Sequence, residues 1–257
     1  MLWLLQIPPV ILGFLWVAVI VGLSVGGLIL FRRVVSHTRL EHTNAVSGSV
    51  SQLAGVLYAV LVAFVVVVVW EQFTDAEDAS SSEATAIADL LRDSAALPAQ
   101  SRGAVDDALI AYTRDVIDDE FPRMHRGETV PEQSDQLVTV WEAYLKVQPE
   151  TRNEIAFFDH AILRLNDLSA ARKERVSTGE ASVPGELWVL LVGGGGVMMA
   201  FTFLFGTKDL VLHALVVGLT SALLAFVLYL IFALEHPYVG ELSVGPTAFV
   251  NVLQDWA

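Results

Sequence analysis

Four long segments without Lys, Arg, Asp or Glu constrain this chain more than any other feature. They cover residues 10–31, 50–70, 187–205 and 210–234. About 20 apolar residues, at about 1.5 Å of rise per residue, form a helix long enough to cross the hydrocarbon core of a bilayer. None of the four segments has the polar stripe that a surface helix of a soluble protein shows. The sequence therefore predicts four membrane-spanning helices.

The connections between these segments predict how the helices are arranged. Residues 32–49 are too polar to span and short enough to join antiparallel neighbours, and residues 206–209 form a tight turn. The predicted fold is an all-α membrane protein, in which two helical hairpins flank a polar domain inserted between helices 2 and 3. The expected domains are an N-terminal hairpin over residues 1–73, an acidic helical domain over residues 74–186, and a C-terminal hairpin with a short tail over residues 187–257.

The charge of the chain is concentrated in the predicted polar domain. Residues 71–186 hold 24 of the 29 acidic side chains and 11 of the 15 basic ones, in a chain with a net charge of −14. Such a surface repels nucleic acid, because binding to phosphate depends on Lys and Arg. It can hold counter-ions or accept a basic partner, although a solubilising charge excess is the simpler interpretation.

The polar domain is predicted to be helical throughout. Apolar residues recur at helical spacing over residues 82–97, 101–121, 134–147 and 149–175, between proline-containing breaks. The second membrane helix has no stop signal at Trp70, so we expect it to continue into this domain. The acidic run Asp118–Glu120 lacks the ligand spacing of a calcium loop and is interpreted as a solvated helix end.

The sequence contains no recognisable catalytic constellation. It has no cysteine, no paired histidine motif, no nucleophile elbow and no phosphate-binding loop. We therefore expect neither an enzyme nor a metal or cofactor site. The run Gly193, Gly194, Gly195 and Gly196 lies inside an apolar span, where small residues let neighbouring helices approach closely. Helix packing is the favoured interpretation of this run, and a flexible point that matters for gating is the alternative.

The side of the membrane on which the polar domain lies stays open. The positive-inside rule compares Lys and Arg near the two ends of the membrane helices. One end has Arg32, Arg33, Arg39 and Lys208, and the other has Arg172, Lys173 and Arg175. This nearly balanced count slightly favours an outside amino terminus and an extracytoplasmic polar domain.

Two stretches of the chain are similar to one known family. The first comprises Leu57-Tyr-Ala-Val-Leu-Val-Ala-Phe64, Trp70-Glu71 and Ser82-Glu83-Ala84; the second comprises Leu234-Glu-His-Pro237-Tyr-Val-Gly240, Pro246 and Phe249. These motifs resemble a bacterial family called bestrophin-like, whose architecture the whole chain matches. The resemblance implies a multi-pass protein of the bacterial plasma membrane, with Pro237 and Gly240 as its C-terminal signature.

The resemblance extends to bestrophins, which are pentameric anion channels with four membrane helices. Their pore-lining second helix closes with a Trp-x-Gln-aromatic run, and Trp70, Gln72 and Phe73 are similar to it. Residues at this position also suit an aromatic anchor at the membrane interface. Counting back from this run, the resemblance places the pore constriction at Gln52, Val56 and Val60, which share one helix face.

Two features of the chain depart from bestrophins. Bestrophin necks favour bulkier residues than Gln52 and the two valines, and the acidic calcium clasp that follows the last membrane helix has no counterpart in residues 240–257. Bestrophin topology also implies a cytoplasmic polar domain, against the charge count.

Two functions follow from these observations. One is a homo-oligomeric, pentameric channel that conducts small anions through a pore lined by the second membrane helix, in which an apolar ring can gate by dewetting. The other is a non-conducting membrane scaffold or sensor whose acidic helical domain binds a partner. In the plainest interpretation, the valine-rich second helix only faces the lipid bilayer.

Overall fold

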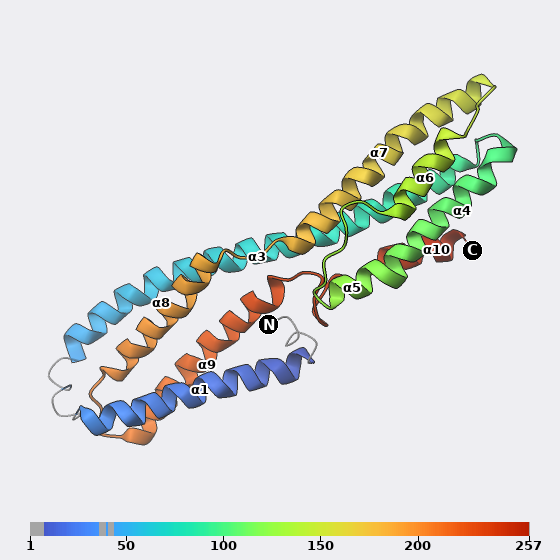
Figure 1. Cartoon of the computed structure of the whole chain (residues 1–257). Helices are drawn as coiled ribbons and strands as arrows, with labels where there is room; N and C mark the ends of the chain where they lie inside the picture. Colours follow the sequence, from blue (N-terminus) through green and yellow to red (C-terminus); the bar gives the residue numbers. More distant parts are fainter. Residues whose placement is uncertain (1–7, 36–39, 41–43, 257) are drawn as a thin grey trace. The chain divides into compact units, whose positions relative to one another are not determined.

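The computed structural model describes residues 8–35, 40 and 44–256, and it is helical in every long element (Figure 1). Arg39, which entered the charge count, lies outside the described residues. The helices are α1 (Pro9–Val34), α3 (Asn44–Ser94), α4 (Ala99–Asp115), the π-helical turn η2 (Val116–Glu120), α5 (Phe121–His125), α6 (Asp135–Leu145), α7 (Arg152–Glu180), α8 (Gly185–Phe203), α9 (Leu210–Leu234) and α10 (Thr247–Trp256). No strand occurs among the described residues.

The chain divides into two compact units. The first unit, called here the polar unit, contains residues 72–181 and 236–257. The second, the membrane unit, contains residues 7–71 and 182–235. In the described part of the chain, four helices are long and apolar enough to cross a membrane, and they correspond to the four uncharged segments.

Close helix contacts hold the membrane unit together. Helices α1 and α9 pack along much of their length, and a Cβ added at Gly13 would lie 3.1 Å from the Tyr229 ring. Trp16 of α1 stacks on Phe232 of α9 with ring centroids 6.0 Å apart. The tight turn before α9 is closed by Asp209, whose side chain accepts hydrogen bonds from two backbone N–H groups of the first turn. Small residues thus let these apolar helices approach closely, as expected inside a bilayer.

Helix α3 is a single helix of 51 residues that carries the chain from one unit into the other. It contains no proline, and its acidic and serine-rich stretch after Trp70 continues the helix, as the absence of a stop signal predicts. The segment predicted as a separate helix from Ser82 is therefore the last part of α3. The helix ends at Ser94, shortly before Pro98, where a proline disfavours helical backbone in the residue that precedes it.

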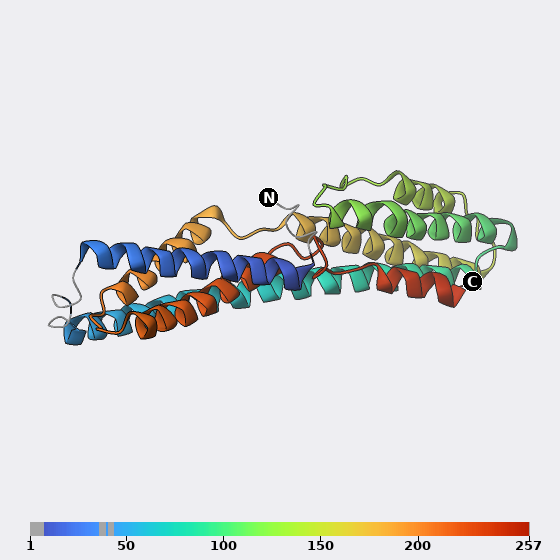
Figure 2. The same ribbon diagram turned by 90° about the horizontal axis from the view of Figure 1, so that it is seen from below.

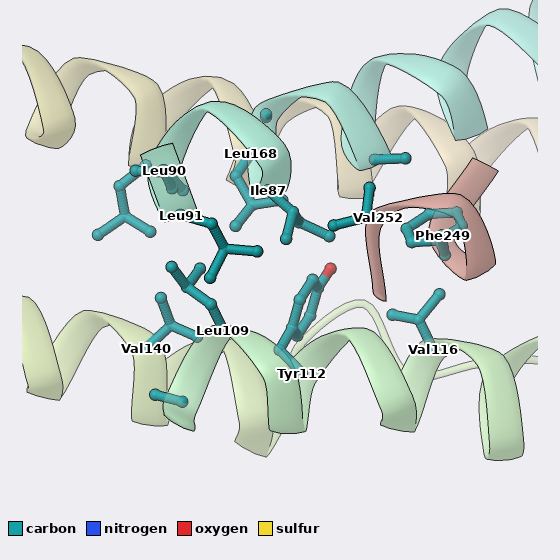
Figure 3. Close-up of a cluster of buried hydrophobic side chains, with 14 of the residues drawn as sticks. Ile87, Leu90, Leu91, Leu109, Tyr112, Val116, Val140, Leu168, Phe249 and Val252 are labelled. Carbon is teal, nitrogen blue, oxygen red and sulfur yellow. The ribbon is translucent and has the colours of Figure 1, made fainter. Parts of the chain in front are cut away.

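The polar unit is a helical bundle built around the second half of α3. Helices α4, α6, α7 and α10 run alongside this part of α3 in both ribbon views (Figures 1 and 2). Their apolar stripes meet in one buried core (Figure 3), which includes Ile87, Leu90, Leu91, Leu109, Tyr112, Val116, Val140, Leu168, Phe249 and Val252. Burial of these stripes is the main favourable contribution to the folding of the unit.

The C-terminal tail packs with the polar unit. The sequence predicts residues 235–257 to belong with the second membrane hairpin, because they follow it directly in the chain. In the structure, Phe249 of α10 is fully buried in the core of the polar unit. The reason is the amphipathic pattern of α10, which places Phe249 and Val252 on one apolar side.

Two residues of the C-terminal signature shape the chain between α9 and α10. The Pro237 carbonyl accepts a hydrogen bond of 2.7 Å from the Val244 N–H. Gly240 has a φ of 79°, a left-handed conformation that glycine adopts without the steric cost other residues meet. Its N–H donates to the His125 carbonyl at 3.4 Å, which ties the turn to the end of α5.

Candidate functional site: the exposed face of α3 and a buried charge cluster

One face of α3 in the membrane unit is left uncovered by the other helices. Gln52, Val56 and Val60 are all exposed, with 58% of Val56 and 53% of Val60 accessible in the single chain. Their spacing of four residues puts them on one side of the helix. The exposed stripe continues through Phe64 and Val67 to Trp70. The three residues predicted for a pore constriction thus lie together on a free, uncharged surface.

The opposite side of α3 contacts α8 through Tyr58. The Tyr58 hydroxyl donates a hydrogen bond of 2.8 Å to the Leu191 carbonyl. A Cβ added at Gly194 would lie 2.7 Å from the Tyr58 ring carbons Cδ2 and Cε2, and one added at Gly195 would lie 3.1 Å from its hydroxyl. A side chain at Gly194 would therefore overlap the ring, and one at Gly195 would press against the hydroxyl.

The other two glycines of the run have a different environment. A Cβ added at Gly193 or Gly196 would meet nothing within 4 Å. The four consecutive glycines therefore divide into a pair that contacts Tyr58 and a pair at which an added Cβ would meet no described residue within 4 Å. The sequence indicates a packing role for the run but does not indicate which two glycines contact another helix, nor that the partner is a tyrosine.

The Trp-x-Gln-aromatic run lies in the middle of α3. Trp70 is exposed, whereas Gln72 and Phe73 are half-buried. Phe73 lines a shallow groove of about 280 Å³ between α3 and the start of α10, together with Glu77 and Val244. Because the helix continues without interruption through this run, an anchoring role of the three residues at the membrane interface remains a prediction.

The polar unit encloses a charge cluster that the sequence does not single out. It consists of Glu83 on α3, Tyr112 on α4, Glu120 at the end of η2, and Arg172 and Arg175 on α7, all with at most 4% of their surface exposed. Glu120 belongs to the acidic run that was interpreted as a solvated helix end. That interpretation is wrong for Glu120, because the π-helical turn places its side chain in the interior while Asp118 and Asp119 stay outside.

The cluster is fully connected by short polar contacts. Arg175 lies between the two glutamates, with its Nε 2.6 Å from Glu83 Oε2 and one terminal nitrogen 2.5 Å from Glu120 Oε2. Arg172 is 2.7 Å from Glu120 and also donates to the Pro131 carbonyl. The Tyr112 hydroxyl donates to Glu83 at 2.5 Å. Two positive and two negative charges are thus neutralised inside the unit, as buried charges require.

Aromatic rings surround the Arg175 guanidinium. Its Cζ lies 5.4 Å from the Phe121 ring centroid and 5.9 Å from that of Phe249. These two rings pack edge to face with centroids 5.6 Å apart, and Phe121 also contacts Tyr238. The C-terminal helix is therefore held directly against the charge cluster.

The electrostatic balance favours the ionised forms of Glu120 and of the two arginines. Burial by itself would raise the pKa of Glu120, but the hydrogen bonds and positive charges of Arg172 and Arg175 outweigh burial and lower it. Burial by itself would lower the pKa of Arg175, but the charge of Glu83 leads the contributions that raise it well above its ordinary value. Burial, followed by the negative charge of Glu83, raises the pKa of Tyr112. Glu120, Arg172 and Arg175 therefore stay charged and Tyr112 stays neutral at physiological pH.

A further buried carboxylate, that of Glu235, lies at the end of α9 in the membrane unit. Glu235 accepts hydrogen bonds from the Val183 backbone N–H at 3.0 Å and from the Trp188 indole N–H at 3.0 and 3.1 Å. These bonds tie the start of α8 to the end of α9. Among the described residues, no group of three or more His, Asp or Glu could hold a metal ion.

Comparison with known proteins identifies the class and then the family of the chain. The fold and its four long apolar helices define a helical membrane protein. The chain is similar to the crystal structure of a bacterial bestrophin homologue from Klebsiella pneumoniae that carries a leucine-to-threonine mutation. The TM-score is 0.70 at 15% identity, over 93% of this chain and 96% of that one. The model of the bestrophin-like domain matches residues 18–249, so the chain belongs to the bestrophin-like family. No curated protein matches the chain.

Proposed function

We propose that this protein is a homo-oligomeric membrane channel that conducts small anions through a pore lined by α3, in the plasma membrane of a bacterium. The observation that carries the proposal is the exposed, uncharged face of α3 with Gln52, Val56 and Val60, in a member of the bestrophin-like family. Bestrophins are anion channels with four membrane helices, which is the number of long apolar helices in the described part of this chain.

The physical basis of the proposal is that one chain cannot enclose a pore with an exposed helix face. Several copies arranged around an axis would turn this face inward and bring equivalent side chains into rings. Two rings of valine and one of glutamine would form a narrow, uncharged constriction, and an apolar constriction gates ion flow by dewetting. The resemblance to bestrophins favours five copies.

The first experiment is the mass of the purified complex in detergent, by native mass spectrometry or light scattering. A pentamer supports the proposal. A monomer or dimer contradicts the proposal, because one or two copies of α3 are not enough to enclose a pore.

The second experiment measures chloride efflux from liposomes that contain the protein. Val56→Ala and Val60→Ala are expected to change the rate, since each removes apolar bulk from the constriction. Val211→Ala is the matched control, because Val211 is exposed on α9 and lies outside the proposed pore face. Equal rates for all three folded variants and the wild type would contradict the assignment of the pore. A flux carried by cations would contradict the anion part of the proposal.

The alternative function is a non-conducting scaffold or sensor that binds a partner through the polar unit. The observation in its favour is the acidic excess of residues 71–186. Because each buried glutamate of the charge cluster is matched by a buried arginine, this excess remains on the surface. A stable, salt-sensitive complex with a basic protein, together with no ion flux, would favour this alternative.

A further inference from the structure

The contact between Tyr58 and α8 lies directly behind the proposed pore face. Residues of a helix are about 100° apart, so Tyr58 points about 160° away from both Val56 and Val60, which lie two positions before and after it. The exposed side of this segment thus carries the proposed constriction, and the covered side carries Tyr58. A shift of α3 at this contact necessarily moves the opposite face.

Two other contacts show that α3 and α8 run antiparallel along this side. A Cβ added at Gly48 would approach Phe205, and one added at Gly55 would lie 3.4 Å from Met198 Cε. Both glycines meet the flexible end or the ring edge of a side chain from α8 or from the residues just after it. Tyr58 differs from them, because its ring lies against the α8 backbone and its hydroxyl is bonded to a backbone carbonyl. The Tyr58 contact therefore fixes both the distance between α3 and α8 and the position of α3 along the α8 axis.

We propose that Tyr58 is the positioning residue of the channel: its ring, seated on Gly194 and Gly195 and hydrogen-bonded to the Leu191 carbonyl, fixes the position of α3 and thereby the width of the constriction. This inference rests on the proposed function. The ring defines the distance between the helices, because any side chain at Gly194 would overlap it. The hydroxyl defines the height along α8, because it bonds a single carbonyl.

The four glycines provide matched variants. Gly194→Ala is expected to displace the Tyr58 ring and change the chloride flux by about threefold to tenfold, the equivalent of one interhelical hydrogen bond in a membrane. Gly193→Ala and Gly196→Ala make the same chemical change in the same helix where nothing lies within 4 Å. These two controls are expected to keep the wild-type flux.

A double-mutant cycle separates the ring from the hydroxyl. A methyl group at residue 195 meets only the hydroxyl region of Tyr58, whereas one at residue 194 meets the ring. Tyr58→Phe should therefore cancel the effect of Gly195→Ala on the chloride flux, so that the double variant has the same flux as Tyr58→Phe alone. Tyr58→Phe should not cancel the effect of Gly194→Ala on the flux. A purely general loss of stability would not distinguish the two neighbouring positions.

The position of α3 is measured independently of conduction. The chain has no cysteine, so cysteines introduced at Leu57 and Val192, both exposed, give a unique spin-labelled pair for distance measurement in complexes diluted with unlabelled chains. Gly194→Ala should change the distance between the labels, and Gly193→Ala should not.

The two readouts distinguish the possible failures. A change of distance together with a change of flux supports the inference. A change of distance with unaltered flux in a conducting protein overturns the role in the pore, and an unaltered distance overturns the positioning role itself. If the wild type does not conduct but the distance changes, the proposed function fails while the positioning of α3 by Tyr58 stands.

Discussion

Replacing Arg175 by methionine tests whether the buried charge cluster holds the polar unit together. Arg175 donates two hydrogen bonds to Glu83, at 2.6 and 3.2 Å, and one of 2.5 Å to Glu120. Without it, Glu120 keeps Arg172, but the Tyr112 hydroxyl is the one hydrogen-bond partner that Glu83 keeps among the described side chains. Leaving a buried charge unpaired in this way costs about 3–5 kcal/mol.

Thermal unfolding in detergent measures this effect. At about 2–4 °C per kcal/mol for a chain of this size, Arg175→Met is expected to lower the apparent Tm by about 6–20 °C. Arg172→Met should have a smaller effect, of about 1.5–3 kcal/mol, because Arg175 still pairs with Glu120. Lys173→Met is the matched control on the same helix. Its 72% exposed side chain faces an equally exposed Glu132, so the expected change is within about 0.5 kcal/mol.

A second substitution identifies the physical cause. Glu83→Gln in the Arg175→Met background removes the unpaired charge while keeping the shape of the side chain, so it should recover part of the lost stability. The reasoning would be refuted if Arg175→Met were no more destabilising than Lys173→Met. Failure of Glu83→Gln to recover any stability would show that lost packing, and not the unpaired charge, causes the effect.

Three further predictions concern the polar unit. The pKa of Glu120 in the folded state lies below its ordinary value, so its carboxylate contributes to the free energy of unfolding at neutral pH, and this contribution is lost progressively as the pH falls below about 4.3. A Glu120→Gln variant should therefore show a weaker acid dependence of Tm. Phe249→Ala should cost about 3–5 kcal/mol and release α10, which limited proteolysis of the C-terminus would detect; an unchanged cleavage pattern would count against docking of α10 through this ring. Gly240→Ala should lower the free energy of unfolding by about 1 kcal/mol or more, because alanine is strained at the positive φ of this residue. Gly103→Ala, at an open position of α4, should raise the free energy of unfolding slightly. Equal effects of the two variants in thermal unfolding would mean that alanine meets no strain in the left-handed turn.

The helical class and the four apolar segments could be predicted because long uncharged runs leave the backbone few alternatives in a membrane. The continuation of α3 past Trp70 was also predictable, since no proline or glycine interrupts the sequence there. The family resemblance was carried by local motifs such as Leu57–Phe64 and is confirmed by the match over residues 18–249. These features depend on neighbouring residues, which a single sequence displays directly.

The charge cluster was missed because charged residues are normally assigned to the surface. A signal was present in α7, where Leu165, Leu168, Arg172 and Arg175 follow one another at helical spacing, so that the two arginines extend an apolar stripe. Their partners could not be identified in the same way, because Glu83 and Glu120 are 92 and 55 residues away from Arg175. The docking of α10 depends on contacts of the same long range. The pairing of Tyr58 with Gly194 and Gly195 likewise joins two helices far apart in the sequence.

The most direct test of the central claim is chemical modification of the proposed pore face. Because the chain has no cysteine, Val56→Cys and Val60→Cys each introduce a single thiol, and Val211→Cys on α9 serves as the control. Chloride flux is measured in liposomes before and after treatment with a small, negatively charged thiol reagent. If α3 lines an anion pore, modification at residues 56 and 60 blocks the flux and modification at residue 211 leaves it unchanged. Complete labelling of both pore-face thiols without any change in flux would contradict the assignment of α3 as the pore-lining helix.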